Sequence, residues 1–359
     1  MRNLTNVLVT GGAGFIGCNF IRMLLTQQVD FKGRIINLDA LTYAGNCASL
    51  CDIFEKFNGG RYFFKKGDIC DKPFVCKIFE KYDIDTVVHF AAESHVDRSI
   101  LAPDIFIKTN VNGTFTLLET ARNFWKKQDG SFSNCNLFHH VSTDEVYGSL
   151  GAFGYFTEKT AYAPRSTYSA SKAAGDHLVM AYNNTYGLPA TLSNCSNNYG
   201  PYQLTKNFVP LMILNMLKSK PLPVYGDGKN IRDWLYVKDH TNAIWTILQK
   251  GKTGEKYNIG GENEIENIML LEVLIETISK KTNICIKKLK NLITFVKDRP
   301  GHDRRYAIDC SKIKKELAWE PKTKFKDGIS ETVEWYLHNK IWIENRLNEN
   351  YKNCIAENC

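Results

Sequence analysis

Two acidic side chains stand next to each other directly after an apolar run. Asp144 and Glu145 follow the segment "NLFHHVST", which is typical of a buried strand. Two close carboxylates repel each other's charge, and desolvation under a substrate raises a pKa further, so one acid can stay protonated while its neighbour ionises. The pair can therefore supply a general acid and a general base. The spacing does not say which acid holds the proton, and a helix cap through Thr143 or Asp144 is an alternative role.

A glycine-rich turn follows the first predicted strand. The segment "VLVTGGAGFIG" places Gly11, Gly12, Gly14 and Gly17 between that strand and the amphipathic run "FIRMLL". Glycines allow tight backbone angles and close approach, while the free N–H groups of the following helix face a pyrophosphate. The strand, turn and helix order therefore predicts a dinucleotide site.

Two further acids follow the next two strands. Asp39 ends the second strand, where a carboxylate can bind the adenosine ribose diol, and Asp68 and Ile69 after the third strand would lie beside the adenine. A carboxylate about 4 Å from a ribose 2′-phosphate costs on the order of 4 kcal/mol at an effective dielectric constant of about 20, which favours NAD over NADP. The alternatives are an ordinary loop acid at position 39 and a turn aspartate at position 68.

Tyr168 and Lys172 lie four residues apart in "TYSASKAAGDHL", on one face of a predicted helix. A tyrosine with its usual pKa near ~10 is a poor base at neutral pH, whereas a neighbouring ammonium and a positive nicotinamide ring would favour the phenolate. The pair alone is equally typical of a helix surface. Together with the glycine turn, it predicts hydride transfer at an alcohol carbon.

The elements that must position these residues alternate along the chain. Six short apolar strands, from "NVLVT" to "LPATLSN", alternate with amphipathic segments between residues 6 and 194. This pattern predicts an α/β fold with a Rossmann-type doubly wound parallel sheet and a smaller mixed α/β substrate-binding domain, with ligands at the carboxyl edge of the sheet. We assign residues 1–196 and 234–260 to the NAD-binding domain, 197–233 and 261–347 to the substrate domain, and 348–359 to a frayed tail.

Composition excludes several classes of protein. The 359 residues are 43% hydrophobic, which supports a large core and more than one domain. Lys+Arg 46 against Asp+Glu 38 gives a net charge of +8, but the lysine cluster at 280–290 has no aromatic platform, so we expect a solvated helix face and no nucleic-acid partner. The 11 cysteines lack metal-ligand spacing, which predicts reduced thiols and no metal site. With no signal or membrane segment in the pattern, we expect a cytoplasmic protein.

The motifs together resemble those of the dTDP-glucose 4,6-dehydratase family of extended short-chain dehydrogenases/reductases. The blocks that match, in order across residues 6–336, are "TGGAGFIG", "LDALTYAGN", "HFAAESHVDRSI", "STDEVYG", "YSASKAAGDHL", "SNCSNNYGPYQ", "IRDWLYVKDH" and "RPGHDRRYAID". The resemblance implies a hydro-lyase that oxidises C-4 of dTDP-glucose, eliminates water across C-5 and C-6 and returns the hydride to C-6, so NAD is regenerated. It assigns Glu145 as the C-5 base and Asp144 as the acid for the 6-hydroxyl, with Thr143 on the C-4 oxygen.

The resemblance also carries over a set of binding residues. For the cofactor it implies Gly11, Gly14, Phe15, Ile16, Gly17, Asp39, Asp68, Ile69, Ala91, Ala92, Thr109, Tyr168, Lys172 and Asn198. For the nucleotide sugar it implies Ser94, Thr143, Asn197, Asn207, Tyr225, Arg232, Asn267, Arg299 and Tyr306. A diphosphate suits bidentate arginines, although either arginine could instead be a structural ion-pair partner. The family also implies a homodimer formed through residues 115–124 and 173–180, and His89 is expected to be a packing residue.

One segment departs from the family pattern. The chain reads "LTKNFVP" where relatives usually carry a Pro-Glu-Lys triplet, so Asn207 stands where a lysine is expected, with Lys206 beside it. An amide can still donate a hydrogen bond, but the ammonium charge near the diphosphate is lost at that position.

Three other functions compete with this prediction. A UDP-glucose 4,6-dehydratase would use the same residues on another nucleotide. A nucleotide-sugar 4-epimerase shares the glycine turn, Tyr168 and Lys172 but needs no acid pair, so Asp144 and Glu145 argue against it. An NAD-binding sensor or scaffold would need no catalytic residues at all.

Overall fold

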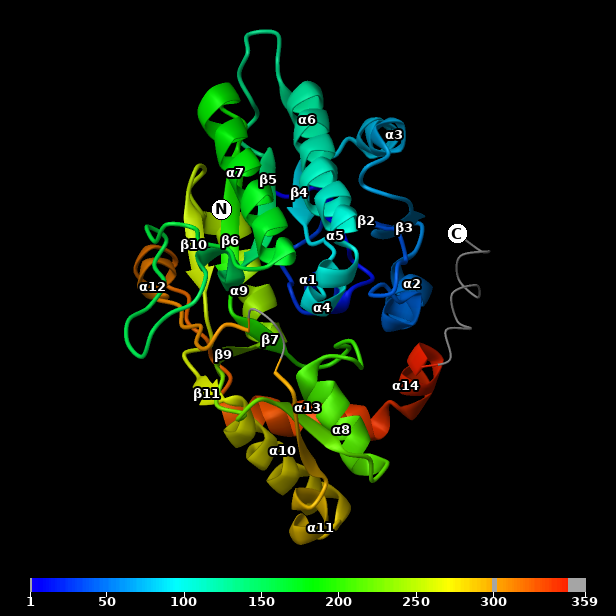
Figure 1. Ribbon diagram of the computed structural model, residues 1–359. Helices are drawn as coiled ribbons and strands as arrows, with labels where there is room; N and C mark the ends of the chain where they lie inside the picture. Colours follow the sequence, from blue (N-terminus) through cyan, green and yellow to red (C-terminus); the bar gives the residue numbers. More distant parts are fainter. Residues whose placement is uncertain (1, 299–301, 348–359) are drawn as a thin grey trace.

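A seven-stranded parallel sheet forms the centre of the larger part of the molecule (Figure 1). The computed structural model describes residues 2–298 and 302–347. The strand order is β10-β6-β5-β4-β1-β2-β3. The strands are β1 (Asn6–Thr10), β2 (Arg34–Asp39), β3 (Tyr62–Lys66), β4 (Thr86–His89), β5 (Leu137–Thr143), β6 (Ala190–Cys195) and β10 (Lys256–Ile259). The predicted doubly wound sheet is confirmed, and its order reverses next to β1, where such folds bind ligands.

Helices cover both faces of this sheet. On one face Val7 and Val9 of β1 pack with α1 (Phe15–Thr26) and α9 (Val237–Lys250). On the other face Leu8 packs with α3 (Lys72–Tyr82), α6 (Thr114–Trp125) and α7 (Thr167–Tyr186). Since side chains alternate along a strand, a strand buried on both faces must be apolar throughout, as "NVLVT" nearly is.

Shorter elements complete this part. They are the helices α2 (Cys51–Phe57), α4 (Val96–Leu101), α5 (Pro103–Phe106) and α12 (Ser311–Leu317), the 3₁₀ turns Cys47–Leu50 and Asp144–Tyr147, and a π-helical segment Ile107–Gly113. Helix α12 packs with α9 and β10 through Ile313 and Leu317. The four-residue strand β10 gave no recognisable sequence signal; it pairs with β6 at the edge of the sheet.

The smaller part of the molecule lies below the sheet in Figure 1. It holds a three-stranded sheet of order β11-β9-β7 and a pair, β12-β8. Its strands are β7 (Asn197–Tyr199), β8 (Leu222–Tyr225), β9 (Ile231–Tyr236), β11 (Glu264–Glu266) and β12 (Ile293–Val296). Its helices are α8 (Phe208–Leu217), α10 (Asn267–Thr282), α11 (Ile286–Lys290), α13 (Phe325–His338) and α14 (Lys340–Leu347). A separate core, centred on Leu271 and Ile275 of α10 and Ile329 of α13, stabilises this part.

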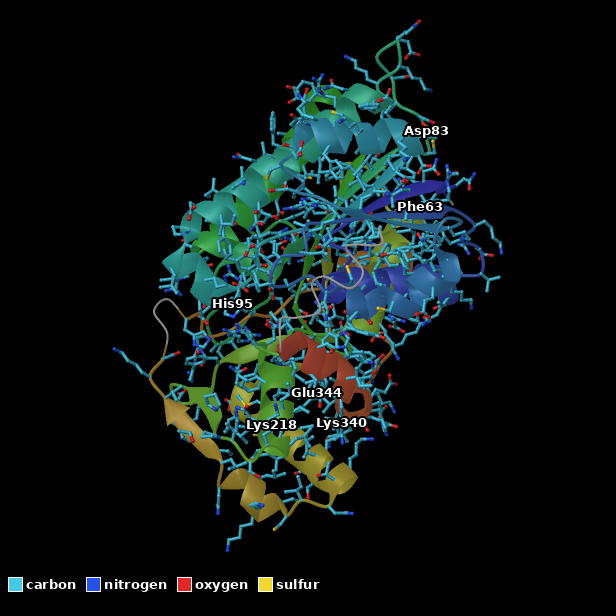
Figure 2. All side chains as sticks on the ribbon, turned by 90° about the vertical axis from the view of Figure 1, so that its right-hand side faces the viewer. Phe63, Asp83, His95, Lys218, Lys340 and Glu344 are labelled. Carbon is cyan, nitrogen blue, oxygen red and sulfur yellow. The ribbon has the colours of Figure 1, made fainter. Side chains whose placement is uncertain are left out.

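The two parts meet at the carboxyl edge of the large sheet. In Figure 2, Phe63 and Asp83 mark the larger part, Lys218 and Lys340 mark the smaller one, and His95 lies near the junction. Strand β9 belongs to the smaller sheet, whereas α9 directly after it packs against α1. The chain therefore crosses between the parts near residue 237. The domain boundaries proposed from the sequence stay a prediction, and the tail 348–359 lies outside the described residues.

Candidate active site

A single cavity of about 400 Å³ runs along the carboxyl ends of β1, β2, β4, β5 and β6. It begins beside Asp39 and Asp68 and extends past Tyr168 to Asn207. All the predicted cofactor residues line it: Gly11, Gly14, Phe15, Ile16, Gly17, Asp39, Asp68, Ile69, Ala91, Ala92, Thr109, Tyr168, Lys172 and Asn198. The fold thus brings segments far apart in the sequence to one elongated site.

The glycine turn forms a cradle that no side chain could share. Gly11 has φ +70°, and a Cβ there would lie 2.6 Å from the backbone nitrogen of Ala91. A Cβ on Gly17 would lie 2.4 Å from the carbonyl oxygen of Gly11. Helix α1 begins after Gly14 without a side-chain cap, so its first N–H groups are available to an anion. These features fit the pyrophosphate of a dinucleotide.

The two acids at the adenosine end also hold their own loops. Asp39 accepts hydrogen bonds from the backbone N–H groups of Ala13 (2.9 Å) and Leu41 (2.8 Å), which ties the glycine turn to the loop after β2. Asp68 accepts from the N–H of Cys70 at 2.9 Å, as a turn aspartate does. Both acids therefore have the structural role, and the predicted binding role is compatible with it, since both side chains also line the cavity.

The acid pair lies on a 3₁₀ turn directly after β5. Thr143 ends the strand, and its Oγ1 accepts a hydrogen bond from the backbone N–H of Glu145 at 3.3 Å. The same hydroxyl donates to Oδ1 of Asp144 at 3.3 Å. Thr143 therefore does cap this short helix, as the alternative role proposed, but the cap turns all three side chains toward the cavity rather than replacing their chemistry.

The two acids differ in their surroundings. Asp144 is only 2% exposed, whereas Glu145 is half-buried. Burial raises the pKa of Asp144 well above its usual value; the charges of Glu145 and Asp233 raise it further, and Arg232 lowers it. These surroundings favour the protonated form of Asp144, and the acid role predicted for it needs that form.

Tyr168 and Lys172 stand on the first turns of α7. A capping box between Ser166 and Ser169 starts this helix and fixes its register. The Lys172 ammonium donates to the carbonyl of Val141 at 2.8 Å, and its Nζ lies 3.4 Å from Nε2 of His140. The pair is buried rather than part of a helix surface, so the surface alternative is wrong.

The ammonium alone does not make Tyr168 a base. Burial raises the pKa of the Tyr168 phenol well above its usual value, and the charge of Glu145 adds to this rise, while a hydrogen bond from Thr143 opposes it. Burial also lowers the pKa of Lys172, which the nearby Asp176 partly restores. The expected stabilisation of a phenolate therefore depends on the further positive charge of a nicotinamide ring, and that part stays a prediction.

A buried polar cluster behind Lys172 was missed from the sequence. Asp176 is 1% exposed, and its Oδ1 lies 3.3 Å from Nε2 of His140. Its other oxygen accepts hydrogen bonds from Ser142 Oγ (2.9 Å), Tyr162 OH (2.9 Å) and Asn194 Nδ2 (3.1 Å). The available signal was the spacing, because Asp176 continues the row of Tyr168 and Lys172 by one more turn.

The predicted sugar contacts divide into two groups. Ser94, Thr143, Asn197 and Asn207 line the cavity. Arg232 and Tyr306 are not among the residues that line it, and the Arg232 guanidinium lies 4.2 Å from the centre of the Tyr306 ring. Arg232 donates to the carbonyls of Ile231 (2.8 Å) and Asp303 (2.9 Å), and its predicted contact with the diphosphate stays a prediction. Both residues interact electrostatically with the acid pair. Arg232 lowers the pKa of Asp144, and the charge of Glu145 raises the pKa of Tyr306.

The remaining sugar contacts lie farther away. Tyr225 is 42% exposed at the end of β8, and Asn267 starts α10; neither lines the cavity formed by the described residues. Arg299 lies outside the described residues. Lys206 is exposed, whereas Asn207 lines the cavity.

Two further observations concern residues singled out in the sequence. His89 lies between Thr10 (2.7 Å) and Thr114 (3.0 Å), in the packing role expected of it. Gln203, which the sequence did not single out, is buried in the cavity wall and donates to the carbonyl of Asn198 at 2.9 Å.

Within residues 2–298 and 302–347 there is no cluster of metal-ligand type and no helix long and apolar enough to span a membrane.

Comparison with known proteins gives a consistent result. The family described as GDP-mannose 4,6 dehydratase matches residues 8–332. The dTDP-glucose 4,6-dehydratase 1 of Escherichia coli K12 is 50% identical over 98% of both chains, and the enzyme of Neisseria meningitidis serogroup B is 49% identical over 97% of this chain and 98% of its own.

Solved structures agree in fold. DesIV, the dTDP-glucose 4,6-dehydratase of Streptomyces venezuelae, solved with NAD and TYD bound, superimposes with a TM-score of 0.85 at 42% identity over 94% of this chain and 98% of its own. The UDP-glucose 4-epimerase of Thermotoga maritima gives a TM-score of 0.80 at 27% identity over 93% of this chain and 99% of its own. The chain therefore belongs to the nucleotide-sugar 4,6-dehydratase family, among its dTDP-glucose 4,6-dehydratases.

Proposed function

We propose that this protein converts dTDP-glucose to dTDP-4-keto-6-deoxyglucose and water, with NAD as its resident cofactor. The observation that carries the proposal is the meeting of an acid pair, Asp144 and Glu145, with Tyr168 and Lys172 at one end of a dinucleotide cavity. Relatives near 50% identity over almost the whole chain bear the name of this activity.

The cofactor end supports NAD. Gly11, Gly14 and Gly17 would hold the pyrophosphate and Asp39 the adenosine ribose, where its carboxylate disfavours a 2′-phosphate. When bound, NAD would accept the hydride from C-4 and give it back at C-6.

The side chains supply the proton transfers. Tyr168 takes the proton of the 4-hydroxyl as the ketone forms, with Lys172 beside it. The ketone makes the C-5 proton acidic, and the half-buried Glu145 takes it. Asp144, whose pKa is raised by burial, protonates the departing 6-hydroxyl. Glu145 finally returns its proton to C-5.

The rival activity on this fold is 4-epimerisation, and the acid pair argues against it, because epimerisation eliminates nothing. Incubation with dTDP-glucose and UDP-glucose side by side, followed by NMR of the products, decides between the candidates. We expect a 4-keto-6-deoxy product from dTDP-glucose in preference to UDP-glucose. A galactose product would establish an epimerase, a preference for UDP-glucose would change the nucleotide, and NAD binding without product would indicate a sensor.

We also propose a homodimer formed through α6 and α7, which pack side by side (Figure 1). Phe115 and Phe124 on α6 and Tyr186 on α7 are large side chains that are each nearly half exposed. Aromatic residues on neighbouring helices are typical of a subunit interface.

A cytoplasmic location is proposed as well, supported by the nine free cysteines in the described part of the chain.

A further inference from the structure

Each turnover leaves two of the proposed catalytic groups in the wrong protonation state. Tyr168 gains the proton of the 4-hydroxyl, whereas Asp144 loses its proton to the water that departs. Glu145 takes the C-5 proton and returns it to C-5, and the hydride leaves C-4 and arrives at C-6, so both of these balance. One proton must therefore pass from Tyr168 to Asp144 before the next turnover. This inference rests on the proposed function and its residue roles.

The side chain of Thr143 lies between the two groups. The side chains of Tyr168 and Thr143 both line the cavity, and Thr143 lies near enough to the phenol to lower its pKa. Oγ1 of Thr143 lies 3.3 Å from Oδ1 of Asp144 and donates to it. A hydroxyl has one donor and two acceptor positions, so the same oxygen also accepts from the backbone N–H of Glu145, at 3.3 Å. This N–H anchors the oxygen between the phenol and the carboxyl. Contacts of this length commonly shorten when a substrate closes the site.

Little water reaches this row of groups. Tyr168 and Thr143 are each 9% exposed and Asp144 is 2% exposed, and a sugar in the cavity would cover what remains. Proton exchange of Asp144 with bulk solvent is therefore hindered while the cavity is filled. An internal route through the threonine hydroxyl would not need the solvent.

We propose that Thr143 relays the proton from Tyr168 to Asp144 and so resets the site after each turnover. The phenolic O–H bond breaks as a new O–H bond forms on Thr143 Oγ1. The original Thr143 O–H bond breaks as one forms on Asp144 Oδ1. Thr143 ends neutral, Tyr168 becomes the phenolate and Asp144 the carboxylic acid, so no charge or atom is left over.

The direction of this transfer depends on the charges around both groups. Burial and the charges of Glu145 and Asp233 raise the pKa of Asp144, with Arg232 opposing them. The pKa of the Tyr168 phenol is raised by burial as well, so the transfer also requires the positive nicotinamide ring, which would favour the phenolate. Proton transfer is efficient between groups of matched pKa. Cys195, the remaining titratable neighbour of both groups, has a pKa raised by burial to about 12 and stays neutral.

The test compares Thr143→Val, which keeps the branched shape and removes the hydroxyl, with Thr143→Ser, which keeps the hydroxyl. Each variant with its cofactor is mixed with excess dTDP-glucose and quenched rapidly. For Thr143→Val we expect one product per site, followed by turnovers slower than the first by about 10²-fold, at the lower end of what a positioned proton-transfer group contributes. Imidazole buffer should speed the slow phase but not the first turnover. Thr143→Ser should show neither the burst nor the buffer effect.

A spectroscopic measurement follows the proton itself. The infrared band of the protonated Asp144 carboxyl, assigned by difference against Asp144→Asn, should vanish after the first turnover of Thr143→Val and persist in Thr143→Ser. If Thr143→Val slows the first and later turnovers equally and keeps the band, Thr143 is only a substrate contact and the relay is refuted. A wild-type protein that makes no 4-keto-6-deoxy product refutes the proposed function instead.

Discussion

At the scale of single residues, the buried Asp144 carboxyl is unfavourable for the folded state. It is buried, and its Oδ2 has no hydrogen-bond partner among the described residues. An unsatisfied buried polar atom costs about 1–3 kcal/mol. The structure thus holds a destabilising group at the position where the proposed chemistry needs a protonated acid, which is a common exchange of stability for activity.

Asp144→Asn should raise the free energy of unfolding at neutral pH by about 1–3 kcal/mol while slowing turnover by about 10²–10⁴-fold. Because the pKa of Asp144 is raised in the folded protein, the wild type loses stability as the pH rises from the unfolded carboxyl value of ~3.9 toward the raised value. The two proteins should therefore differ least below pH ~4 and increasingly above it. Urea unfolding at several pH values measures this. A variant no more stable than wild type at neutral pH would contradict the account.

Glu145→Gln should separate oxidation from elimination. The variant keeps Tyr168 and Lys172, so C-4 oxidation can proceed, but the C-5 proton has no base. Absorbance of the reduced cofactor should then accumulate during a single turnover and decay slowly. Tyr168→Phe is the matched control, since it blocks oxidation and should show no such absorbance. Normal dehydration by Glu145→Gln would remove Glu145 from the base role.

At the scale of secondary structure, helix α7 carries three functional side chains on successive turns. Tyr168 and Lys172 line the cavity, and Asp176, one turn further along the helix, contacts His140. Burial lowers the pKa of Lys172 and the charge of Asp176 raises it, so the carboxylate keeps the ammonium charged. Tyr168, Lys172 and Asp176 thus form a buried polar row along α7. Polar side chains of β5 and β6 surround its last member, since Ser142 and Asn194 donate hydrogen bonds to Asp176.

Asp176→Asn should shift the alkaline limb of the pH-rate profile to lower pH. Without the carboxylate, the pKa of Lys172 falls further, so the ammonium is lost at a lower pH and activity declines with it. Tyr162→Phe is the control, because it removes one hydrogen bond to Asp176 and leaves the charge. An unchanged alkaline limb in Asp176→Asn would show that Lys172 does not need this partner.

The sequence predicted the six strands from β1 to β6 and the turns after them because their signals are local. Gly11, Gly17 and Asp39 act within one strand, turn and helix unit, and the pair Tyr168 and Lys172 within one helix. What the sequence could not supply depends on contacts between distant segments. The raised pKa of Asp144 comes from burial by other elements, and the polar cluster at Asp176 joins α7 to β5 and β6.

The substrate side was the least predictable for the same reason. Asn197 and Asn207 line the cavity, whereas Arg232 donates to the carbonyl of its neighbour Ile231 and to that of Asp303 in a separate segment. A side chain on the smaller part of the molecule binds the sugar only if the two parts meet at the right angle. That angle depends on packing between segments and has no local sequence pattern.

At the scale of the whole molecule, the apolar surface of α6 and α7 predicts the oligomeric state. Phe115→Asp combined with Phe124→Asp should convert a dimer to a monomer, because charges buried in an interface lose their hydration. Light scattering after size-exclusion chromatography measures the mass. Phe153→Asp is the control, since Phe153 is 90% exposed in the loop after Gly148 and belongs to neither helix. Unchanged mass in the double variant would move the interface elsewhere.

The proposed reaction requires that one cavity oxidise C-4 and reduce C-6 of the same sugar without releasing the hydride. The most direct test supplies dTDP-glucose carrying deuterium at C-4 and locates the label in the product by NMR and mass spectrometry. We expect deuterium in the C-6 methyl group of dTDP-4-keto-6-deoxyglucose. Deuterium retained at C-4 of a galactose product, or lost to the solvent, would contradict it.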